Sequence, residues 1–427
     1  MIDLKRLRQD AEASRANLAR RLDPALPGQV DRVLELDRQH RESLRRFEAL
    51  RAERKAASEE VARLKKAKQP ADELLARLKA SGDEEKALEA AVRTAEAAVS
   101  HELSLLPNLL LPQVPDGDAS ANRVVRSWST PRSFGFAPKP HWELGETLGI
   151  LDLPAGARIA GSGFPLFRGQ GARLVRGLAS FMLDLHATEH GYVEIAPPYL
   201  VSYDSVFGTG QMPKFAEELY RTRDDDLYLI PTAEVPVTNI HRGAVLDGAQ
   251  LPIAYVAWTP CFRREAGAHG KDTRGLIRVH QFDKVELVRF TRPELSEREH
   301  DVITRHAETV LQRLELPYRV VDLAAGDTGN ASAHTFDLEV WAPGVSAWLE
   351  VSSASTFTDY QARRANIRYR PEPGAKPEFV HTLNASGVAF PRCVVALLEN
   401  GQQADGSVRL PDALVPYVGV SRLEPPA

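Results

Sequence analysis

Along the first hundred residues, hydrophobic side chains recur in alternating steps of three and four positions, the heptad pattern of a coiled coil. One series begins at Val33 and ends at Leu64, and a second begins at Leu74 and ends at Leu106. The stretch Lys66–Pro70 separates them and predicts a turn. A helix of about 35 residues reaches about 50 Å. The pattern therefore predicts an antiparallel helical hairpin that forms a projecting arm.

Beyond this arm the pattern changes. Three prolines and an Asp-Gly-Asp segment favour a linker over residues 106–126. The remaining pattern predicts helices at 171–189 and 294–314 and strands around 226–231, 253–264, 276–290, 317–323, 335–341 and 347–353. Helices are too sparse for a doubly wound parallel sheet, so we expect an α+β fold, with an antiparallel sheet flanked by helices. The predicted domains are a helical arm (1–105) and a mixed domain (127–427).

One predicted strand carries a distinctive polar face. If 276–290 is a continuous strand, its even-numbered residues share one face; these are Arg278, His280, Phe282, Lys284 and Glu286. By the same parity Arg263 shares a face with Glu265, and Thr232 with Glu234. The stretch 266–275, rich in glycine and charge, resembles loops that close on ligands.

These residue types fit an anionic, aromatic ligand such as ATP. Arginine offers a planar fork to phosphate, and a phenylalanine ring offers a stacking surface to a base. The alternative is that this polar face is an ordinary surface of the sheet that is exposed to solvent. His280 lies on the same face with no role that the pattern assigns.

The composition of the chain restricts the classes of function that it can have. The 427 residues carry a net charge of -4, so a nucleic-acid contact would need a local patch. Between Arg41 and Lys68, ten basic residues stand against five acidic ones; this is either a solvated coiled-coil face or a phosphate-binding surface. Two cysteines exclude a disulfide scaffold, a four-cysteine metal site and an iron–sulfur cluster. With no apolar signal segment at the start, we expect a cytoplasmic protein.

Five segments of the mixed domain carry most of the candidate chemistry. They are 190–200 with Pro198, 231–236, 262–265 with 274–286, 350–353, and 387–392 with Arg392. The first, third and last resemble motifs 1, 2 and 3 of class II aminoacyl-tRNA synthetases. All five in this order resemble the bacterial seryl-tRNA synthetase family. The resemblance runs end to end, since that family also carries an N-terminal helical hairpin.

The resemblance implies a set of site residues. Arg263 would hold the α-phosphate and the serine carboxylate, and Arg392 the γ-phosphate; these two are the implied catalytic residues. The implied ATP ligands are Arg263, Glu265, Arg278, Val279, Phe282, Glu350, Val351, Ser352, Ser353 and Arg392. The implied serine ligands are Thr232, Ala233, Glu234, Arg263, Glu286, Asn384 and Ser386. Glu350 and Ser353 resemble Mg²⁺ ligands, and no zinc is expected.

The implied activity is serine–tRNA ligation. ATP and L-serine would form seryl-adenylate, and the seryl group would pass to the 3′ end of tRNA(Ser), and also of tRNA(Sec). The resemblance further implies a homodimer built through motif 1, with neither DNA nor a membrane as a partner. The implied tRNA contacts are the basic residues of the arm, Arg45, Arg46, Arg54, Lys55, Arg63 and Lys65.

Two alternatives share the catalytic domain. A seryl-type activator of carrier proteins typically lacks the long arm. A non-catalytic RNA-binding paralogue would have lost residues such as Arg263, Glu286 or Arg392, all of which are present. The sequence departs from the family pattern at a few positions, which are Asn330, His334, Ala354 and Thr356.

Overall fold

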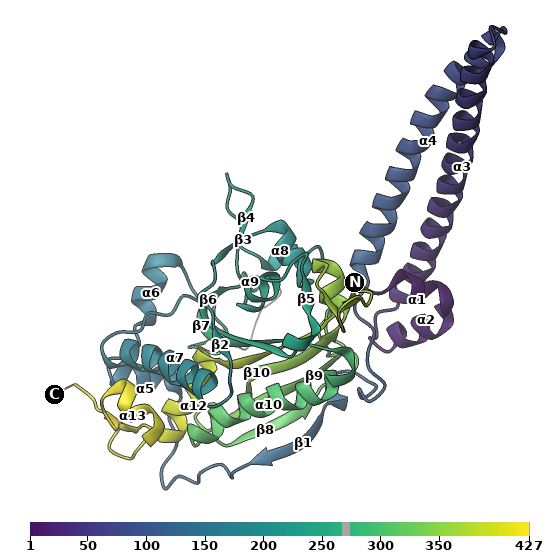
Figure 1. Cartoon of the computed structure of the whole chain (residues 1–427). Coiled ribbons are helices and arrows are strands. Elements are labelled where there is room, and N and C mark those ends of the chain that lie inside the picture. Colours follow the sequence, from purple (N-terminus) through teal and green to yellow (C-terminus); the bar gives the residue numbers. More distant parts are fainter. Residues whose placement is uncertain (267–273, 427) are drawn as a thin grey trace. The chain divides into compact units, whose positions relative to one another are not determined.

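The computed structural model of the chain describes residues 1–266 and 274–426. They divide into two compact units (Figure 1). One contains Ile2–Ala19 and Asp23–Pro107, and the other contains the chain from Asn108 onward together with Met1 and Arg20–Leu22. Within the described residues, no helix has both the length and the apolar character needed to cross a membrane.

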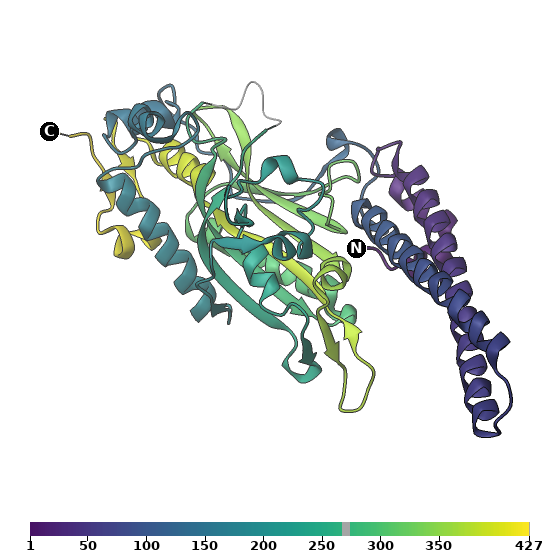
Figure 2. The ribbon, with the colours of Figure 1, turned by 90° about the horizontal axis from the view of Figure 1, so that it is seen from above.

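The first unit is helical. Its helices are α1 (Leu4–Gln9), α2 (Ala11–Ala19), α3 (Leu26–Lys66) and α4 (Asp72–Leu105). Helices α3 and α4 lie side by side in both views (Figure 1, Figure 2). Every position of the two predicted heptad series is buried or half-buried, whereas most of the intervening positions are exposed. The predicted hairpin is therefore confirmed, and its 41-residue first helix is about 60 Å long.

The second unit is built on an eight-stranded sheet. Its strand order is β1-β8-β9-β10-β13-β7-β6-β2, and every pair is antiparallel except β2 with β6. The strands are β1 (Arg123–Trp128), β2 (Val193–Glu194), β6 (Ile253–Phe262), β7 (Gln281–Thr291), β8 (Tyr318–Asp322), β9 (His334–Ala342), β10 (Ala347–Thr358) and β13 (His381–Ala389). The α+β fold with an antiparallel sheet is confirmed.

Shorter strands form three small sheets beside the large one. They are β3 (Leu200–Ser202) with β4 (Leu227–Leu229); β5 (Val245–Asp247), β11 (Arg368–Arg370) and β12 (Glu378–Phe379); and β14 (Val408–Arg409) with β15 (Arg422–Leu423). The helices of this unit are α5 (His141–Thr147), α6 (Leu153–Ala160), α7 (Gln170–Thr188), α8 (Tyr203–Gly208), α9 (Glu234–Asn239), α10 (Ser296–Arg313), α11 (Tyr360–Ala365), α12 (Phe390–Gly401) and α13 (Val415–Val418).

The main core lies between one face of the large sheet and helices α7, α10 and α12. Apolar side chains of these helices and of the central strands form one cluster. In β7, Val285 and Leu287 join that cluster, so the alternate residues Lys284 and Glu286 point to the opposite face. That opposite face carries the candidate site.

Two details differ from the sequence-based expectation. Strand β7 begins at Gln281 rather than at 276, so Arg278 and His280 precede the strand and its parity does not place them. The predicted linker range also makes ordered contacts: Asn108 and Leu111 donate backbone hydrogen bonds to Asn330 and Ala333, and β1 begins at Arg123. Most of the glycine-rich loop, 267–273, lies outside the described residues.

Candidate active site

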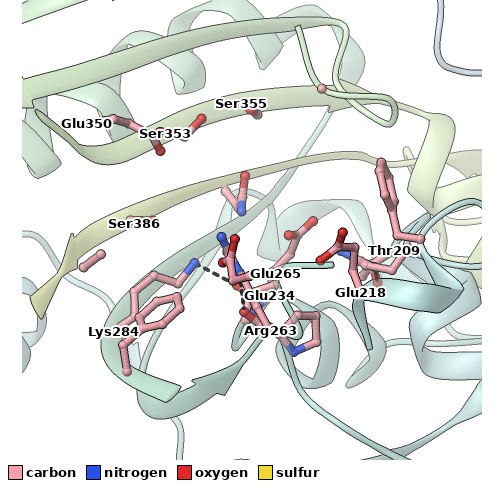
Figure 3. A pocket seen from close by; sticks show the side chains of 18 of the residues that line it. Thr209, Glu218, Glu234, Arg263, Glu265, Lys284, Glu350, Ser353, Ser355 and Ser386 are labelled. Atoms are coloured by element: carbon pink, nitrogen blue, oxygen red, sulfur yellow. Dashed lines mark hydrogen bonds between the residues drawn. The ribbon is translucent and has the colours of Figure 1, made fainter. Parts of the chain in front are cut away.

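A cavity of about 760 Å³ opens on the polar face of the large sheet (Figure 3). Strands β7, β10 and β13 form one part of its wall. Segments that follow β4 and β6, and the segment before β7, form another, and the start of α12 closes one end. A volume of this size suits a ligand as large as a nucleotide.

Most of the residues predicted from the sequence meet in this cavity. Those that line it are Thr232, Glu234, Arg263, Glu265, Arg278, Val279, Phe282, Glu350, Val351, Ser353, Asn384, Ser386 and Arg392. Ala233, Glu286 and Ser352 do not line it and are almost fully buried. Glu286 lies directly behind the wall, because Asn384 Nδ2 donates to its Oε1 at 2.7 Å. Ser352 Oγ points the other way and donates to the carbonyl of Ser386.

Two β-bulges bring these side chains to the same face. Glu350 and Ser353 are three residues apart, so a regular strand would point them to opposite faces. The register of β10 shifts between Glu350 and Ser352, and both residues then face the cavity (Figure 3). A second bulge, between Ser386 and Val388 of β13, lets the wall continue to residue 389.

One end of the cavity is organised around Arg263. Its backbone N–H donates to the carbonyl of His280 at 2.9 Å, and His280 Nδ1 donates to the carbonyl of Arg263 at 3.0 Å. The guanidinium carbon lies 5.2 Å from the centre of the Phe282 ring. Glu265 accepts a hydrogen bond of 2.6 Å from Arg278. These two hydrogen bonds fix the main chain at Arg263. They give a structural role to His280, to which the sequence pattern assigned none.

Strand parity does not explain why Arg263 and Glu265 share the site. Strand β6 ends at Phe262, and Glu265 has a positive φ of 50°. Likewise Thr232 lies in a turn, and Glu234 is the first residue of helix α9. The parity argument was wrong for both pairs, although all four residues line the cavity.

Near Arg263, at this end of the cavity, Lys284 holds the polar wall together, and no role was predicted for it. The lysine is buried, pairs with Glu286 and donates from Nζ to Thr232 Oγ1 at 2.9 Å. The sequence placed Lys284 on the polar face of its strand, but an alternating pattern cannot show that an ammonium group is buried. Only the structure shows that Lys284 lies between two carboxylates.

Glu234 is the second carboxylate at this end. It is buried, and Gln361 Nε2 donates to its Oε1 at 2.5 Å. Burial, followed by repulsion from Glu286, raises the pKa of Glu234 to about 7. Burial also raises the pKa of Glu286, an effect that the charge of Lys284 opposes. The charge of Arg263 also opposes the rise in the pKa of both carboxyl groups.

Arg392 closes the end of the cavity nearest α12. Its Nη1 donates to the carbonyl of Glu350 at 2.8 Å and lies 3.4 Å from the Glu350 carboxylate, and its Nε donates to the carbonyl of Ile277 at 3.0 Å. A guanidinium fixed at two backbone oxygens presents its charge in one direction, as a phosphate-binding arginine requires.

The residues near Glu350 fit a magnesium ion. Glu350 and Ser353 offer oxygens to the cavity, and Asp337 pairs with Ser353 across the strands. The Oδ1 atom of Asp337 is buried with no hydrogen-bond partner, and burial followed by the charge of Glu350 raises the pKa of Asp337 well above its usual range. The described residues contain no cluster of three or more His, Cys, Asp or Glu side chains suited to a metal. Magnesium, which keeps waters and phosphate oxygens as ligands, fits so small a set.

Comparisons with known proteins identify the family of the chain. The seryl-tRNA synthetase N-terminal domain family matches residues 1–110, and the class II tRNA synthetase core domain family (G, H, P, S and T) matches residues 215–401. The serine–tRNA ligase of Gemmatimonas aurantiaca is 54% identical over 98% of this chain and 99% of its own length. The chain belongs to the seryl-tRNA synthetase family.

Solved structures of that family share the whole fold. Seryl-tRNA synthetase from Pyrococcus horikoshii, complexed with ATP, is 38% identical, with a TM-score of 0.94 over 100% of both chains. The cytoplasmic serine–tRNA ligase of Naegleria fowleri, in complex with AMP, is 31% identical, with a TM-score of 0.84 over 97% of this chain and 96% of its own. The sequence resemblance to the seryl family is therefore confirmed.

The departures from the family pattern have separate surroundings. Asn330 lines the cavity and accepts a hydrogen bond from Lys214 at 3.0 Å. His334 is buried against Asp322, and Thr356 pairs with Ser296. Of these substitutions, only the one at 330 changes the cavity wall itself.

The basic residues predicted to contact tRNA do not share one environment. Arg54 lies inside the seam between α3 and α4, where its Nε pairs with Glu85 at 2.8 Å and its Nη1 donates to the carbonyl of Leu78 at 3.0 Å. Arg46 and Arg63 pair with glutamates on their own helix. Arg45, Lys55 and Lys65 are exposed. Arg54 therefore holds the hairpin together rather than facing outward.

Proposed function

We propose that the cavity binds ATP and L-serine side by side and joins them as seryl-adenylate. The supporting observation is the convergence of two kinds of side chain on one cavity. Arg263 and Arg392 supply fixed cations for phosphate, while Thr232, Glu234 and Asn384 supply the hydrogen-bonding groups of a small polar pocket. The P. horikoshii relative has been solved with ATP, which supports the same ligand for this chain.

In the proposed reaction, a serine carboxylate oxygen attacks the α-phosphorus. The bond to the bridging oxygen breaks, and pyrophosphate leaves with that electron pair. The carboxylate is already ionised, so the step needs no general base. The residues have to orient two anions and neutralise the charge that develops between them, and both arginines fit that task. The 3′-hydroxyl of the terminal adenosine of tRNA then attacks the seryl carbonyl and releases AMP.

The proposed roles follow the geometry of the cavity. Glu265 reads the adenine amino group, and Phe282 stacks on the base beside the backbone of Val279. Arg278 reaches toward the ring of the base. The other proposed ATP contacts are Val351, Ser352 and Ser353, and the other proposed serine contacts are Ala233, Glu286 and Ser386. Ala233, Glu286 and Ser352 would act through backbone atoms or neighbours, because their side chains do not line the cavity.

Glu350 and Ser353 would hold Mg²⁺, which neutralises phosphate charge when bound. The buried carboxylate of Asp337 behind Ser353 supports this assignment. The ion pair between Arg392 and Glu350, 3.4 Å long, would open or lengthen as the carboxylate turns to the cation. The chain's own contribution at this point is to keep both oxygens on one face through the bulge in β10.

The arm, residues 1–105, is proposed to bind tRNA(Ser) and tRNA(Sec), with 106–126 as the linker and 127–427 as the catalytic domain. Serine tRNAs have differing anticodons, so a shared feature outside the anticodon must be read. A hairpin about 60 Å long has the reach for this. The exposed Arg45, Lys55 and Lys65 are its outward phosphate contacts, and Arg46 and Arg63 add partly paired charge.

We also propose a cytoplasmic homodimer formed through the segment around β2. This strand is at the edge of the large sheet, and Val193, Tyr199 and Leu200 are exposed there, 58%, 46% and 46% respectively. Large apolar side chains beside an open sheet edge favour an isologous interface between two copies. Analytical ultracentrifugation at micromolar concentration tests this, and a monomer contradicts it.

The decisive experiment has two stages. Serine-dependent exchange of labelled pyrophosphate into ATP measures the first step, with alanine and threonine as competing amino acids. Alanine lacks the hydroxyl that the pocket would bind and should be rejected by far more than tenfold. Charging of bulk bacterial tRNA with serine measures the second step, with a carrier protein as the alternative acceptor. Exchange without tRNA charging would contradict the ligase assignment.

A further inference from the structure

A buried imidazole–carboxylate pair lies behind the cavity wall and does not line it. His141 is the first residue of α5, and Glu399 lies in α12. Both side chains are fully buried, and His141 Nδ1 is 2.8 Å from Glu399 Oε1. The two helices pack against each other (Figure 1). A polar pair at this depth requires partners for all its atoms.

The hydrogen bonds fix the protonation state of the ring. The backbone N–H of Leu276 donates to His141 Nε2 at 3.0 Å. An amide nitrogen can only donate, so Nε2 carries no proton, and the ring proton is on Nδ1, from which it is donated to Glu399. The imidazole is therefore neutral, and each of its two nitrogens has a different, fixed task.

Glu399 is held as firmly as the ring. Its Oε1 also accepts from the backbone N–H of His141 at 2.9 Å, and its Oε2 accepts from Gly344 and Val345 at 2.8 and 3.2 Å. This carboxylate thus ties α12 to the start of α5 and to the turn between β9 and β10. The ring that it orients cannot shift without breaking several of these bonds.

The His141 ring supports the backbone at Leu276. The part of the cavity wall that is proposed to bind the nucleotide begins there. Leu276 begins the stretch 276–279, and all four residues line the cavity. Helix α12 also contacts the next residue directly, since Arg392 Nε donates to the carbonyl of Ile277 at 3.0 Å. The preceding Gly275 has a φ of +72°, and a Cβ there would come within 2.2 Å of His141 Nε2. The ring therefore fills the space against this backbone, where only glycine fits.

We propose that His141 is a positioning residue for the nucleotide. Through its bond to Leu276 it sets the place of Arg278 and Val279 against the base. This role rests on the proposed function of that wall as the ATP site. The serine end should be indifferent to it, because Thr232 and Asn384 are carried by other elements with their own contacts.

His141→Phe removes both ring nitrogens while keeping a ring of similar size. We expect the KM for ATP in serine-dependent pyrophosphate exchange to rise about tenfold, since a buried N–H loses its acceptor, and the KM for serine to stay within about twofold. His141→Gln, whose amide can accept from Leu276 and donate to Glu399, should restore most of the loss. An unchanged KM for ATP, or an equal rise in both constants, overturns the proposal.

A control separates positioning from a general loss of packing. His241 is partly buried, bonds the Tyr255 hydroxyl at 3.0 Å and does not line the cavity, so His241→Phe should change neither KM selectively. If His141→Phe does not fold, Gly275→Ala is the second variant. Its added Cβ would collide with His141 Nε2 and should also raise the KM for ATP. No rise in that variant overturns the proposal.

Direct titration of ATP by calorimetry distinguishes this proposal from the proposed function. It compares the wild type with His141→Phe without any reaction. Equal ATP affinity in the two proteins overturns the positioning role. A wild type that binds ATP but shows no serine-dependent exchange contradicts the proposed function alone, and a weaker ATP affinity in His141→Phe still supports the positioning role.

Discussion

Replacing Lys284 with methionine should destabilise the catalytic unit in a pH-dependent way. Lys284 pairs with Glu286, and the two side chains are only 6% and 0% exposed. Methionine fills a similar volume but leaves the carboxylate without its counter-ion, and Thr232 without its donor. Removing one partner of a buried ion pair typically costs about 3–5 kcal/mol. We expect a loss in that range at neutral to slightly alkaline pH.

The stability of this variant should depend on pH because a buried carboxyl group without a counter-ion binds a proton and becomes neutral. Without Lys284, only the hydrogen bond from Asn384 and the charge of Arg263 oppose the burial that raises the pKa of Glu286, and we expect the group to bind a proton on folding. The folded state then holds a proton that the unfolded state has released, so stability falls as pH rises. While the folded group keeps its proton, each pH unit above the ordinary pKa of glutamate lowers the free energy of unfolding by about 1.4 kcal/mol. The loss should therefore be larger near pH 7.5 than near pH 5.5.

Urea unfolding followed by tryptophan fluorescence measures this loss. All five tryptophans lie between Trp128 and Trp348, so the signal reports on the catalytic unit and not on the arm. Free energies from linear extrapolation at several pH values give the slope directly. The same protein samples serve for the KM of serine in pyrophosphate exchange, which should rise because Lys284 lines the cavity.

A matched control lies on the same strand. Arg289 and Glu299 form a comparably buried pair with a bond of 2.7 Å, but Arg289 does not line the cavity. Arg289→Met should lose similar stability without a rise in the KM for serine. The reasoning is refuted if Lys284→Met loses less than about 1 kcal/mol near pH 7.5, or if the loss does not change with pH.

Three further predictions concern catalysis and tRNA. Arg392→Ala should lower the rate of pyrophosphate exchange by about 10²–10³, since it removes a fixed cation at the phosphate end; a rate near wild type contradicts this. Glu234, with its pKa raised to about 7, is protonated in the free enzyme at lower pH and cannot then pair with an ammonium. The KM for serine should therefore fall as pH rises through 7, and Glu234→Gln should abolish that dependence. Reversing the charges of Lys55 and Lys65 should raise the KM for tRNA in charging assays and leave pyrophosphate exchange unchanged; equal impairment of both would contradict the arm's role.

Regular periodicity explains what the sequence could predict of the fold. The seam of the arm repeats every three or four residues, and those positions are the shielded ones in the structure. Strands β6, β8 and β9 were predicted to within two residues because alternation persists along them, whereas β7 and β10 were misplaced by five residues at one end and β1, β2 and β13 were not predicted. Arg54 is a polar residue in that seam, where its charge pairs with Glu85.

Interruptions of periodicity explain what could not be predicted. The bulges of β10 and β13 each insert one residue, which reverses parity beyond that point. Parity therefore could not place Glu350 beside Ser353. The stretch before Gln281 is not strand at all, and Arg278 reaches the site from that irregular segment. Recognition of family motifs located these residues, because a motif preserves spacing whether or not the backbone is regular.

The buried charges around Lys284 show why such a site resists prediction from local patterns. Glu234 and Glu286 lie on different elements, and the one lysine between them pairs with Glu286. Lys284 and Arg263 both oppose the charges of the two buried carboxyl groups, yet burial and, after it, repulsion from Glu286 still raise the pKa of Glu234 to about 7. On the proposed assignment, the α-ammonium of serine adds a further cation beside Glu234. The cost of keeping Glu234 charged in a buried site would then be lower with serine bound, so that cost would favour binding of serine.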